Sequence, residues 1–176
     1  MSLLERVDKA IRTIPDFPEK GIMFKDITPI LENAVLSTDI VDELMRQWAD
    51  IKIDAIAGVE SRGFLFGFSL AMKLGVPFIL IRKKGKLPAE TISYKYDLEY
   101  GSAEIEVHVD SIEKGMNVLI HDDLLATGGT AAAAAELIKK SEGLISGFSF
   151  VVELEFLKGK EALNKYSELN KSIINY

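Results

Sequence analysis

Residues 118–130 read VLIHDDLLATGGT, and this stretch gives the strongest indication of the fold. An apolar strand at 117–120 delivers two adjacent carboxylates, Asp122 and Asp123, to its carboxyl end. A loop of small and hydroxyl-bearing residues follows, and a helix is expected at 129–140, where alanine is the best helix former. The order strand, loop, helix is typical of proteins built around a parallel sheet.

The loop at 126–130 has the features of a phosphate cradle. Its two glycines allow positive φ and a close approach of backbone to ligand. Amide groups then point into one concavity at the positive end of the helix dipole, and the threonines add hydroxyl donors. The Walker lysine and the GxGxxG spacing are both missing. We therefore predict that a phosphate is bound by Ala126, Thr127, Gly128, Gly129 and Thr130.

The paired aspartates upstream suit a different group. A carboxylate accepts hydrogen bonds, so Asp122 and Asp123 fit the vicinal hydroxyls of a ribose. A phosphate in the loop and hydroxyls on the aspartates together describe a ribose 5-phosphate. The alternative is a solvated acidic turn in front of an ordinary helix.

Outside this stretch, apolar strands alternate with helices. Strands are predicted at 54–59, 76–81 and 147–154, and a helix at 62–74. Continuous apolar strands of this kind indicate an α/β fold, with a central parallel sheet flanked by helices. Ligands bind such sheets at the carboxyl ends of the strands. We expect one domain spanning 1–176.

Two segments depart from this alternation. Within the N-terminal arm, 1–36, apolar residues at helical spacing predict a helix that stops before Pro15, and 15–29 is expected to be extended or loop. Ser37 or Thr38 is the predicted cap of the next helix. Between 83 and 115, period-two alternation predicts two antiparallel strands that form a flexible hairpin flap.

Composition excludes several classes of function. A net charge of -6 argues against a nucleic-acid partner. The absence of cysteine excludes disulfides and thiolate metal sites. The first ten residues lack the apolar core of a signal peptide, and no apolar run approaches the ~20 residues of a membrane span. We predict a cytoplasmic protein that binds neither nucleic acid nor membrane.

The stretch 118–130 resembles the phosphoribosyl pyrophosphate signature of the type I phosphoribosyltransferases. The resemblance to the adenine-specific branch of that family extends over almost the entire chain. The similar segments are 17–31 (FPEKGIMFKDITPIL), 57–66 (AGVESRGFLF), 80–88 (LIRKKGKLP), 98–106 (LEYGSAEIE) and 152–160 (VELEFLKGK).

The resemblance implies roles for further residues. The planar guanidinium of Arg62 can donate two hydrogen bonds to a pyrophosphate. The residues implied to bind pyrophosphate are Glu60, Ser61, Arg62, Gly63 and Lys83. Arg82 is expected to be partly structural. Phe24 is expected to stack on adenine, the backbone of Met23 and Lys25 to read its edge, and Leu157 to form the opposite wall. Glu99, beside Tyr100 on the flap, is the implied acid/base, and with Arg62 it makes up the catalytic pair.

Each role has a plainer alternative. Arg62 is equally expected at a helix start beside a packing glycine, Lys83 in a solvated charge run, Phe24 in the core, and Glu99 on an exposed strand. Relatives often carry arginine in place of Lys25, which weakens a role for that side chain.

The activity implied is the conversion of adenine and phosphoribosyl pyrophosphate to AMP and pyrophosphate by a homodimer. Mg²⁺ is expected to be held by substrate and water, with no direct protein ligand. The alternatives are a transferase for another base, such as xanthine, hypoxanthine–guanine or orotate, and a purine-sensing regulator without catalysis. The sequence offers no account of His121.

Overall fold

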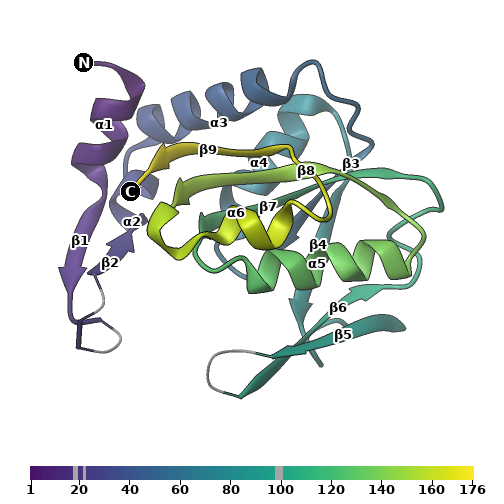
Figure 1. The fold of residues 1–176 in the computed structure, drawn as a ribbon. Coiled ribbons are helices and arrows are strands. Elements are labelled where there is room, and N and C mark those ends of the chain that lie inside the picture. Colours follow the sequence, from purple (N-terminus) through teal and green to yellow (C-terminus); the bar gives the residue numbers. More distant parts are fainter. Residues whose placement is uncertain (18–19, 22, 98–100) are drawn as a thin grey trace.

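The structure is a computed structural model that describes residues 1–17, 20–21, 23–97 and 101–176. Glu99 and Tyr100 lie outside the described residues. Figure 1 shows the elements, which in chain order are α1 (Leu3–Ala10), β1 (Arg12–Pro15), β2 (Met23–Asp26), α2 (Thr28–Leu31), α3 (Ala34–Trp48), β3 (Ala55–Val59), α4 (Gly63–Leu74), β4 (Phe78–Lys83), β5 (Thr91–Asp97), β6 (Ser102–His108), β7 (Asn117–Leu125), α5 (Gly129–Lys140), β8 (Leu144–Glu153), the 3-10 helix η1 (Glu155–Leu157), α6 (Gly159–Leu163) and β9 (Asn170–Asn175).

A mixed sheet forms the centre of the molecule, with the order β5-β6-β4-β3-β7-β8-β9. The pairs β4–β3, β3–β7, β7–β8 and β8–β9 are parallel, whereas β6 pairs antiparallel with β4 and β5 pairs antiparallel with β6. The predicted central parallel sheet is therefore confirmed. The predicted hairpin, β5–β6, is joined to it through the pairing of Arg82 with Glu106.

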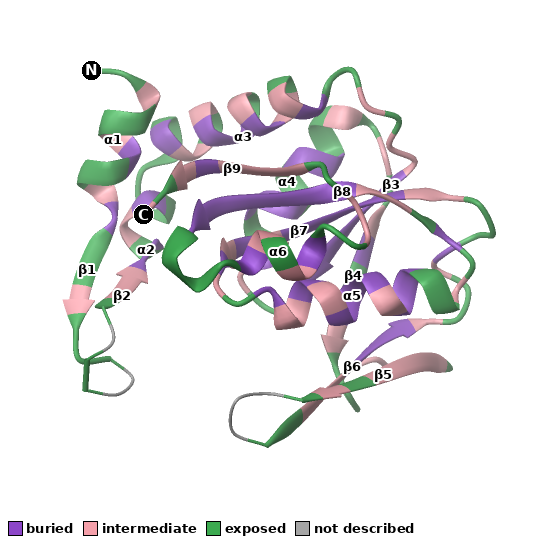
Figure 2. Cartoon of the chain, in the orientation of Figure 1, coloured by how far each residue is buried: buried purple, intermediate pink, exposed green. Residues whose placement is uncertain are grey.

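Helices cover both faces of the sheet, with α3 and α4 on one and α5 on the other (Figure 1). Successive strand residues point to opposite faces. Ile56 and Leu119 accordingly pack with α3 and α4, whereas Ala57 and Ile120 pack with α5. The buried residues lie along the central strands and the inner sides of the helices (Figure 2).

The N-terminal arm differs from its prediction. The first helix ends at Ala10, and β1 pairs antiparallel with β2 in a separate two-stranded sheet. The apolar spacing that continues to Ile14 was therefore misleading. Thr13 and Ile14 are β-branched and favour an extended chain. Pairing with β2 also stabilises a strand here, and the spacing of the apolar residues carries no information about that pairing.

The cap of α3 was also predicted wrongly. Asn33 is the N-cap, and its Oδ1 accepts a hydrogen bond from the Leu36 amide at 3.0 Å. Ser37 and Thr38 lie inside the helix, where Thr38 donates to the Ala34 carbonyl. Asparagine is as strong a cap as serine, so the helix begins one turn earlier than expected.

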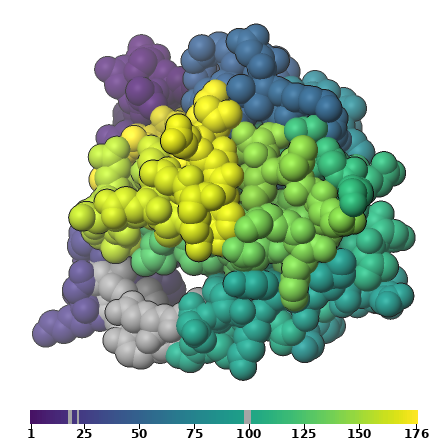
Figure 3. Space-filling view, turned by 45° about the vertical axis from the view of Figure 1, so that its right-hand side comes forward, coloured from purple at the N-terminus to yellow at the C-terminus, as the bar shows by residue number. Residues whose placement is uncertain are grey.

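The C-terminal part of the chain holds elements that the sequence did not reveal, namely η1, α6 and the edge strand β9. In the space-filling view this yellow segment lies between the helices α1 and α3 above and the green and teal surface of α5 and the hairpin below (Figure 3). The strand predicted at 117–120 continues to Leu125, so both aspartates lie within β7. In the part of the chain that the structure describes, no helix combines the length and the apolar character that a membrane span requires.

Candidate functional site

The loop between β7 and α5 is shaped by one glycine in a left-handed conformation. Gly128 has φ of 83° and caps α5, whereas Gly129 already belongs to the helix. A methyl group on Gly129 would meet no atom closer than 3.9 Å, so the space above the helix start is open. A cavity of about 80 Å³ lies there, lined by residues 124–131, Asp122 and Phe150. Its size suits a small anion rather than a whole ligand, which needs ~300 Å³ or more.

Helix α6 supports this loop from behind. A Cβ atom on Gly128 would lie 2.7 Å from the carbonyl oxygen of Gly159, and one on Gly159 would lie 2.3 Å from the carbonyl oxygen of Ala126. Backbone therefore packs on backbone, and neither position has room for a side chain. Gly159 was missed as a site residue, although it lies in the LKGK segment at 157–160.

The two aspartates occupy different environments at the end of β7. Asp123 is buried, and its Oδ2 lies 3.0 Å from Nε of Arg62, the residue that precedes α4. The N–H of Arg62 does not point at that oxygen, so the contact is an ion pair without a hydrogen bond. Asp122 Oδ1 accepts a hydrogen bond from the Asp123 amide at 2.8 Å.

Burial dominates the ionisation of both carboxyls. It raises the pKa of Asp122 well above the ordinary value, and the adjacent charge of Asp123 raises it further. Burial also raises the pKa of Asp123, although the guanidinium of Arg62 opposes that shift. Two carboxylates this close resist ionising together. A ligand that donates hydrogen bonds would relieve this repulsion.

This arrangement predicts a stability effect for Asp122→Asn. An acid whose folded pKa is raised stabilises the fold while protonated, and that stability is lost as pH rises through the folded pKa. The variant cannot ionise, so it should unfold at a higher temperature than the parent at about pH 8. The difference should shrink toward about pH 4, where the parent keeps its proton. Thermal unfolding followed at both pH values checks this; a lower melting temperature at the higher pH would contradict it.

Close packing of α4 against β7 brings Arg62 to the aspartates. A Cβ atom on Gly63 would lie 2.8 Å from the His121 carbonyl oxygen, and one on Gly67 would lie 3.1 Å from the His121 ring. His121 is fully buried, with Nδ1 3.1 Å from Ser149 Oγ, and burial lowers its pKa to about 3. It is therefore a neutral residue packed between β7 and α4, and its buried Nε2 has no hydrogen-bond partner among the described residues.

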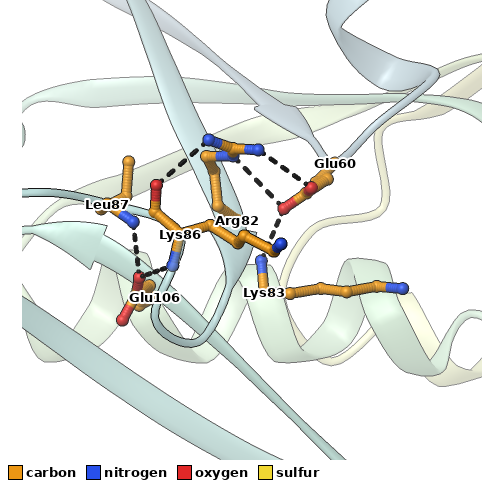
Figure 4. Close-up of polar contacts among 6 residues, drawn as sticks. All are labelled: Glu60, Arg82, Lys83, Lys86, Leu87 and Glu106. Atoms are coloured by element: carbon orange, nitrogen blue, oxygen red, sulfur yellow. Dashed lines mark hydrogen bonds and ion pairs between the residues drawn. The ribbon is translucent and has the colours of Figure 1, made fainter.

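Glu60 is held by cationic and amide groups of its own chain (Figure 4). Its carboxylate accepts hydrogen bonds from Arg82 Nη2 at 3.1 Å, from Arg82 Nε at 3.3 Å and from the Lys83 amide at 2.8 Å. Burial works against ionisation, but these donors lower the pKa of Glu60. Arg82 also donates to the Lys86 carbonyl oxygen, so the expected structural role of Arg82 is confirmed.

A second set of contacts fixes the segment that leads into the hairpin. Glu106 is buried and accepts hydrogen bonds at 3.0 Å from the amides of Lys86 and Leu87 (Figure 4). The side chain of Lys83 extends away from Glu60, while its amide remains bound (Figure 4). Ser61 follows Glu60 through a cis peptide bond and leads into Arg62. The ammonium of Lys83 is thus directed outward, at the end of β4.

The residues predicted to hold a base lie on two segments. Phe24 is half-buried on β2, with its ring centroid 5.1 Å from that of Phe17 and 5.5 Å from the guanidinium carbon of Arg62. Arg62 therefore contacts both Phe24 and Asp123. Met23 is exposed beside it. Leu157, in η1 beyond the carboxyl end of β8, is 38% exposed.

Comparisons with known proteins agree on one family. A model of the phosphoribosyl transferase domain matches residues 25–161. The chain is 52% identical to an adenine phosphoribosyltransferase of Cytophaga hutchinsonii, over 99% of this chain and 96% of the relative.

Solved structures show the same likeness. The adenine phosphoribosyltransferase of Thermoanaerobacter pseudethanolicus superposes with a TM-score of 0.94 at 48% identity, covering 98% of this chain and 99% of that one. The Saccharomyces cerevisiae protein, in complex with adenine and an imino-altritol bisphosphate, gives 0.90 at 41% identity, with 98% of both chains covered.

Proposed function

The chain belongs to the adenine phosphoribosyltransferase family, and from this premise we propose that its site converts adenine and phosphoribosyl pyrophosphate to AMP and pyrophosphate. The observation that carries the proposal is the order of groups at the carboxyl edge of the sheet. The loop 126–130, the aspartates of β7, Arg62 and Phe24 follow one another there. The loop suits the 5-phosphate and the aspartates suit the ribose, while Arg62 and Phe24 suit the two groups that are exchanged at C1, the leaving anion and the flat base.

In the reaction, N9 of adenine forms a bond to C1 of the ribose while the bond from C1 to the pyrophosphate oxygen breaks. Its electron pair leaves with pyrophosphate, and the proton on the imidazole ring of adenine must go to a base. Positive charge grows on the sugar, beside Asp122 and Asp123, and negative charge on the leaving group, beside Arg62. By resemblance we assign the proton to Glu99, and turnover of Glu99→Gln at saturating adenine tests that assignment.

Mg²⁺ fits this scheme as a partner of the substrate. Among the described residues, no group of three or more His, Asp or Glu side chains is placed to hold a metal. Mg²⁺ commonly keeps water and phosphate oxygens as its ligands, so pyrophosphate and ribose oxygens would hold it near Asp122 and Asp123. When bound, it would neutralise charge on the departing pyrophosphate.

The β5–β6 hairpin is the segment we propose to exclude water, since the activated ribose would otherwise hydrolyse. Tyr96 on β5 already reaches the phosphate loop, where its hydroxyl lies 3.3 Å from Oγ1 of Thr130. The start of the hairpin is held by Glu106. When the hairpin closes, these held residues would stay in place while the rest of the hairpin moves.

We further propose a cytoplasmic location, which cell fractionation tests.

We propose a homodimer formed through the apolar face of α4 and β4. Phe68 and Leu80 are 53% and 40% exposed there and line a hollow of about 510 Å³ together with Phe64, Leu65 and Phe78. An exposed apolar patch of this kind marks an interaction surface.

Phe68→Glu should therefore shift the protein to a monomer, because a carboxylate would be buried in the interface. Light scattering measures the mass. Leu144→Glu is the matched control, since Leu144 is 55% exposed at the start of β8, and it should leave the mass unchanged. A parent protein that is monomeric at the outset would refute the dimer.

An assay of nucleotide formation tests the activity itself. Purified protein with phosphoribosyl pyrophosphate and Mg²⁺ is offered adenine, guanine, hypoxanthine, xanthine or orotate, and we expect AMP from adenine in large excess over other products. A 6-oxo base presents an acceptor where adenine presents a donor, so one pocket does not serve both equally. Preference for another base would identify a different transferase. Binding of phosphoribosyl pyrophosphate without any product would favour a regulator.

A further inference from the structure

Tyr176 makes contacts to three separate segments of the chain. Its hydroxyl donates to Asp8 Oδ1 on α1 at 2.6 Å, and Lys25 Nζ on β2 lies 3.7 Å from its ring centroid. Its amide donates to the carbonyl oxygen of Glu153, and its carbonyl oxygen accepts from the amide of Glu155, both at 2.8 Å. One half-buried residue thus connects the first helix, the arm and the start of η1.

The contact with Lys25 lies on the back of the strand that carries Phe24. Adjacent residues of a strand point to opposite faces, and here Phe24 faces Arg62 while Lys25 faces Tyr176. Lys25 also donates to Oγ1 of its cross-strand partner Thr13 at 3.1 Å. The two-stranded sheet β1–β2 therefore makes a cation–ring contact on each of its faces. On one face the guanidinium of Arg62 lies over the ring of Phe24, and on the other the ammonium of Lys25 lies over the ring of Tyr176.

The backbone contacts of Tyr176 reach the segment that leads to Leu157, the residue expected to lie opposite Phe24. Glu153 ends β8, and Glu155 begins η1, the short helix that carries Leu157. The backbone N–H of Tyr176 is hydrogen-bonded to Glu153, and its backbone oxygen is hydrogen-bonded to Glu155. A displacement of Tyr176 would consequently move the segment of Leu157 as well as the segment of Phe24.

We propose that Tyr176, together with Lys25, is a positioning residue for the base: it sets the separation between the strand that carries Phe24 and the helix that carries Leu157. The inference rests on the proposed function, because it assigns the space between these two segments to adenine. It also gives the side chain of Lys25 a purpose. That side chain points away from the base and supports the strand, which leaves recognition of the base edge to the backbone.

We call the contact between Tyr176 and Lys25 the brace. The brace should affect binding of the base and not binding of the sugar phosphate. The phosphate loop is supported by α6 through Gly128 and Gly159, a contact that does not involve Tyr176. Weakening the brace should raise KM for adenine, because the pocket must then be ordered when the base binds. KM for phosphoribosyl pyrophosphate should stay constant.

The chain offers a matched control. Tyr166 donates its hydroxyl to Glu136 Oε1 at 2.6 Å, and Lys165 Nζ lies 4.8 Å from its ring centroid. It thus repeats the hydroxyl–carboxylate bond and a cation over the ring, with Lys139 Nζ as a second, more distant cation at 5.6 Å, but it packs on Phe148 beneath α5 rather than on the arm.

The experiment compares Lys25→Met/Tyr176→Phe with Lys165→Met/Tyr166→Phe in steady-state assays that vary each substrate. The first pair should raise KM for adenine about fivefold, the size expected for loss of a cation–π contact. Its KM for phosphoribosyl pyrophosphate should stay within about twofold, as should both constants of the control pair. Lys25→Arg keeps a cation over the ring and should recover most of the affinity that Lys25→Met loses.

Either of two results would overturn the brace. One is an unchanged KM for adenine in the Lys25/Tyr176 pair; the other is an equal rise for both substrates, which would indicate general loosening. Failure of the proposed function is seen separately, as an unaltered protein that makes no AMP. If that protein uses another base, the same comparison is run with that base.

Discussion

Asp123→Asn is expected to lower kcat/KM for phosphoribosyl pyrophosphate by about 10- to 100-fold. The substitution keeps the shape of the side chain but exchanges an anionic acceptor for a neutral amide, and a hydrogen bond to a charged group contributes about 1.5–3 kcal/mol. Arg62 loses its ionic partner at 3.0 Å in the same step. The leaving anion and the ribose are thus both affected, and steady-state kinetics with varied phosphoribosyl pyrophosphate measures the loss.

Asp54→Asn is the control for this change. Asp54 accepts hydrogen bonds from the amide and from Nδ2 of Asn117, at 2.8 and 2.6 Å. It therefore lies beside the start of β7, at the opposite end of that strand from Asp123. Its replacement should lower stability and leave kcat/KM unchanged. Unchanged rate and affinity in Asp123→Asn would mean that β7 does not hold the ribose.

The strand, loop and helix at 117–140 were predicted well because short-range features determine them. An apolar run, paired glycines and an alanine-rich segment each act within a few residues. The one local error concerned length, since β7 continues through Asp122 and Asp123 to Leu125. Acidic residues are depleted in strands, but pairing with β8 up to Glu153 overrides that preference.

Features that depend on contacts between residues far apart in the chain could not be predicted from the sequence. Gly159 is 31 residues from Gly128, and only the folded chain shows that their backbones touch. The strand β9, residues NKSIIN, lacks a clear apolar period and is defined by its pairing with β8. The contact of Lys25 with Tyr176 joins residues that are 151 positions apart in the sequence. Such pairs carry no signal in spacing.

Gly128→Ala should be the most damaging change in the loop 126–130. A left-handed conformation costs an L-residue about 1–2 kcal/mol, and Gly128 has φ of 83°. The new Cβ would also lie 2.7 Å from the carbonyl oxygen of Gly159, so the loop or α6 must shift. A displacement near 1 Å at a positioned group lowers catalysis by roughly 100-fold. We expect kcat/KM for phosphoribosyl pyrophosphate to fall by about that factor.

Gly115→Ala separates the two causes. Gly115 has φ of 78°, close to that of Gly128, but a Cβ atom there would meet nothing within 4 Å. Both variants should therefore lose the same stability from backbone strain, and Gly128→Ala should lose more because of the clash. Only Gly128→Ala should lose activity with phosphoribosyl pyrophosphate. Thermal unfolding and steady-state kinetics on both variants give the comparison. Equal kinetics would show that contact between the loop and α6 does not position the phosphate, and the anion would then have to be held elsewhere at this edge of the sheet.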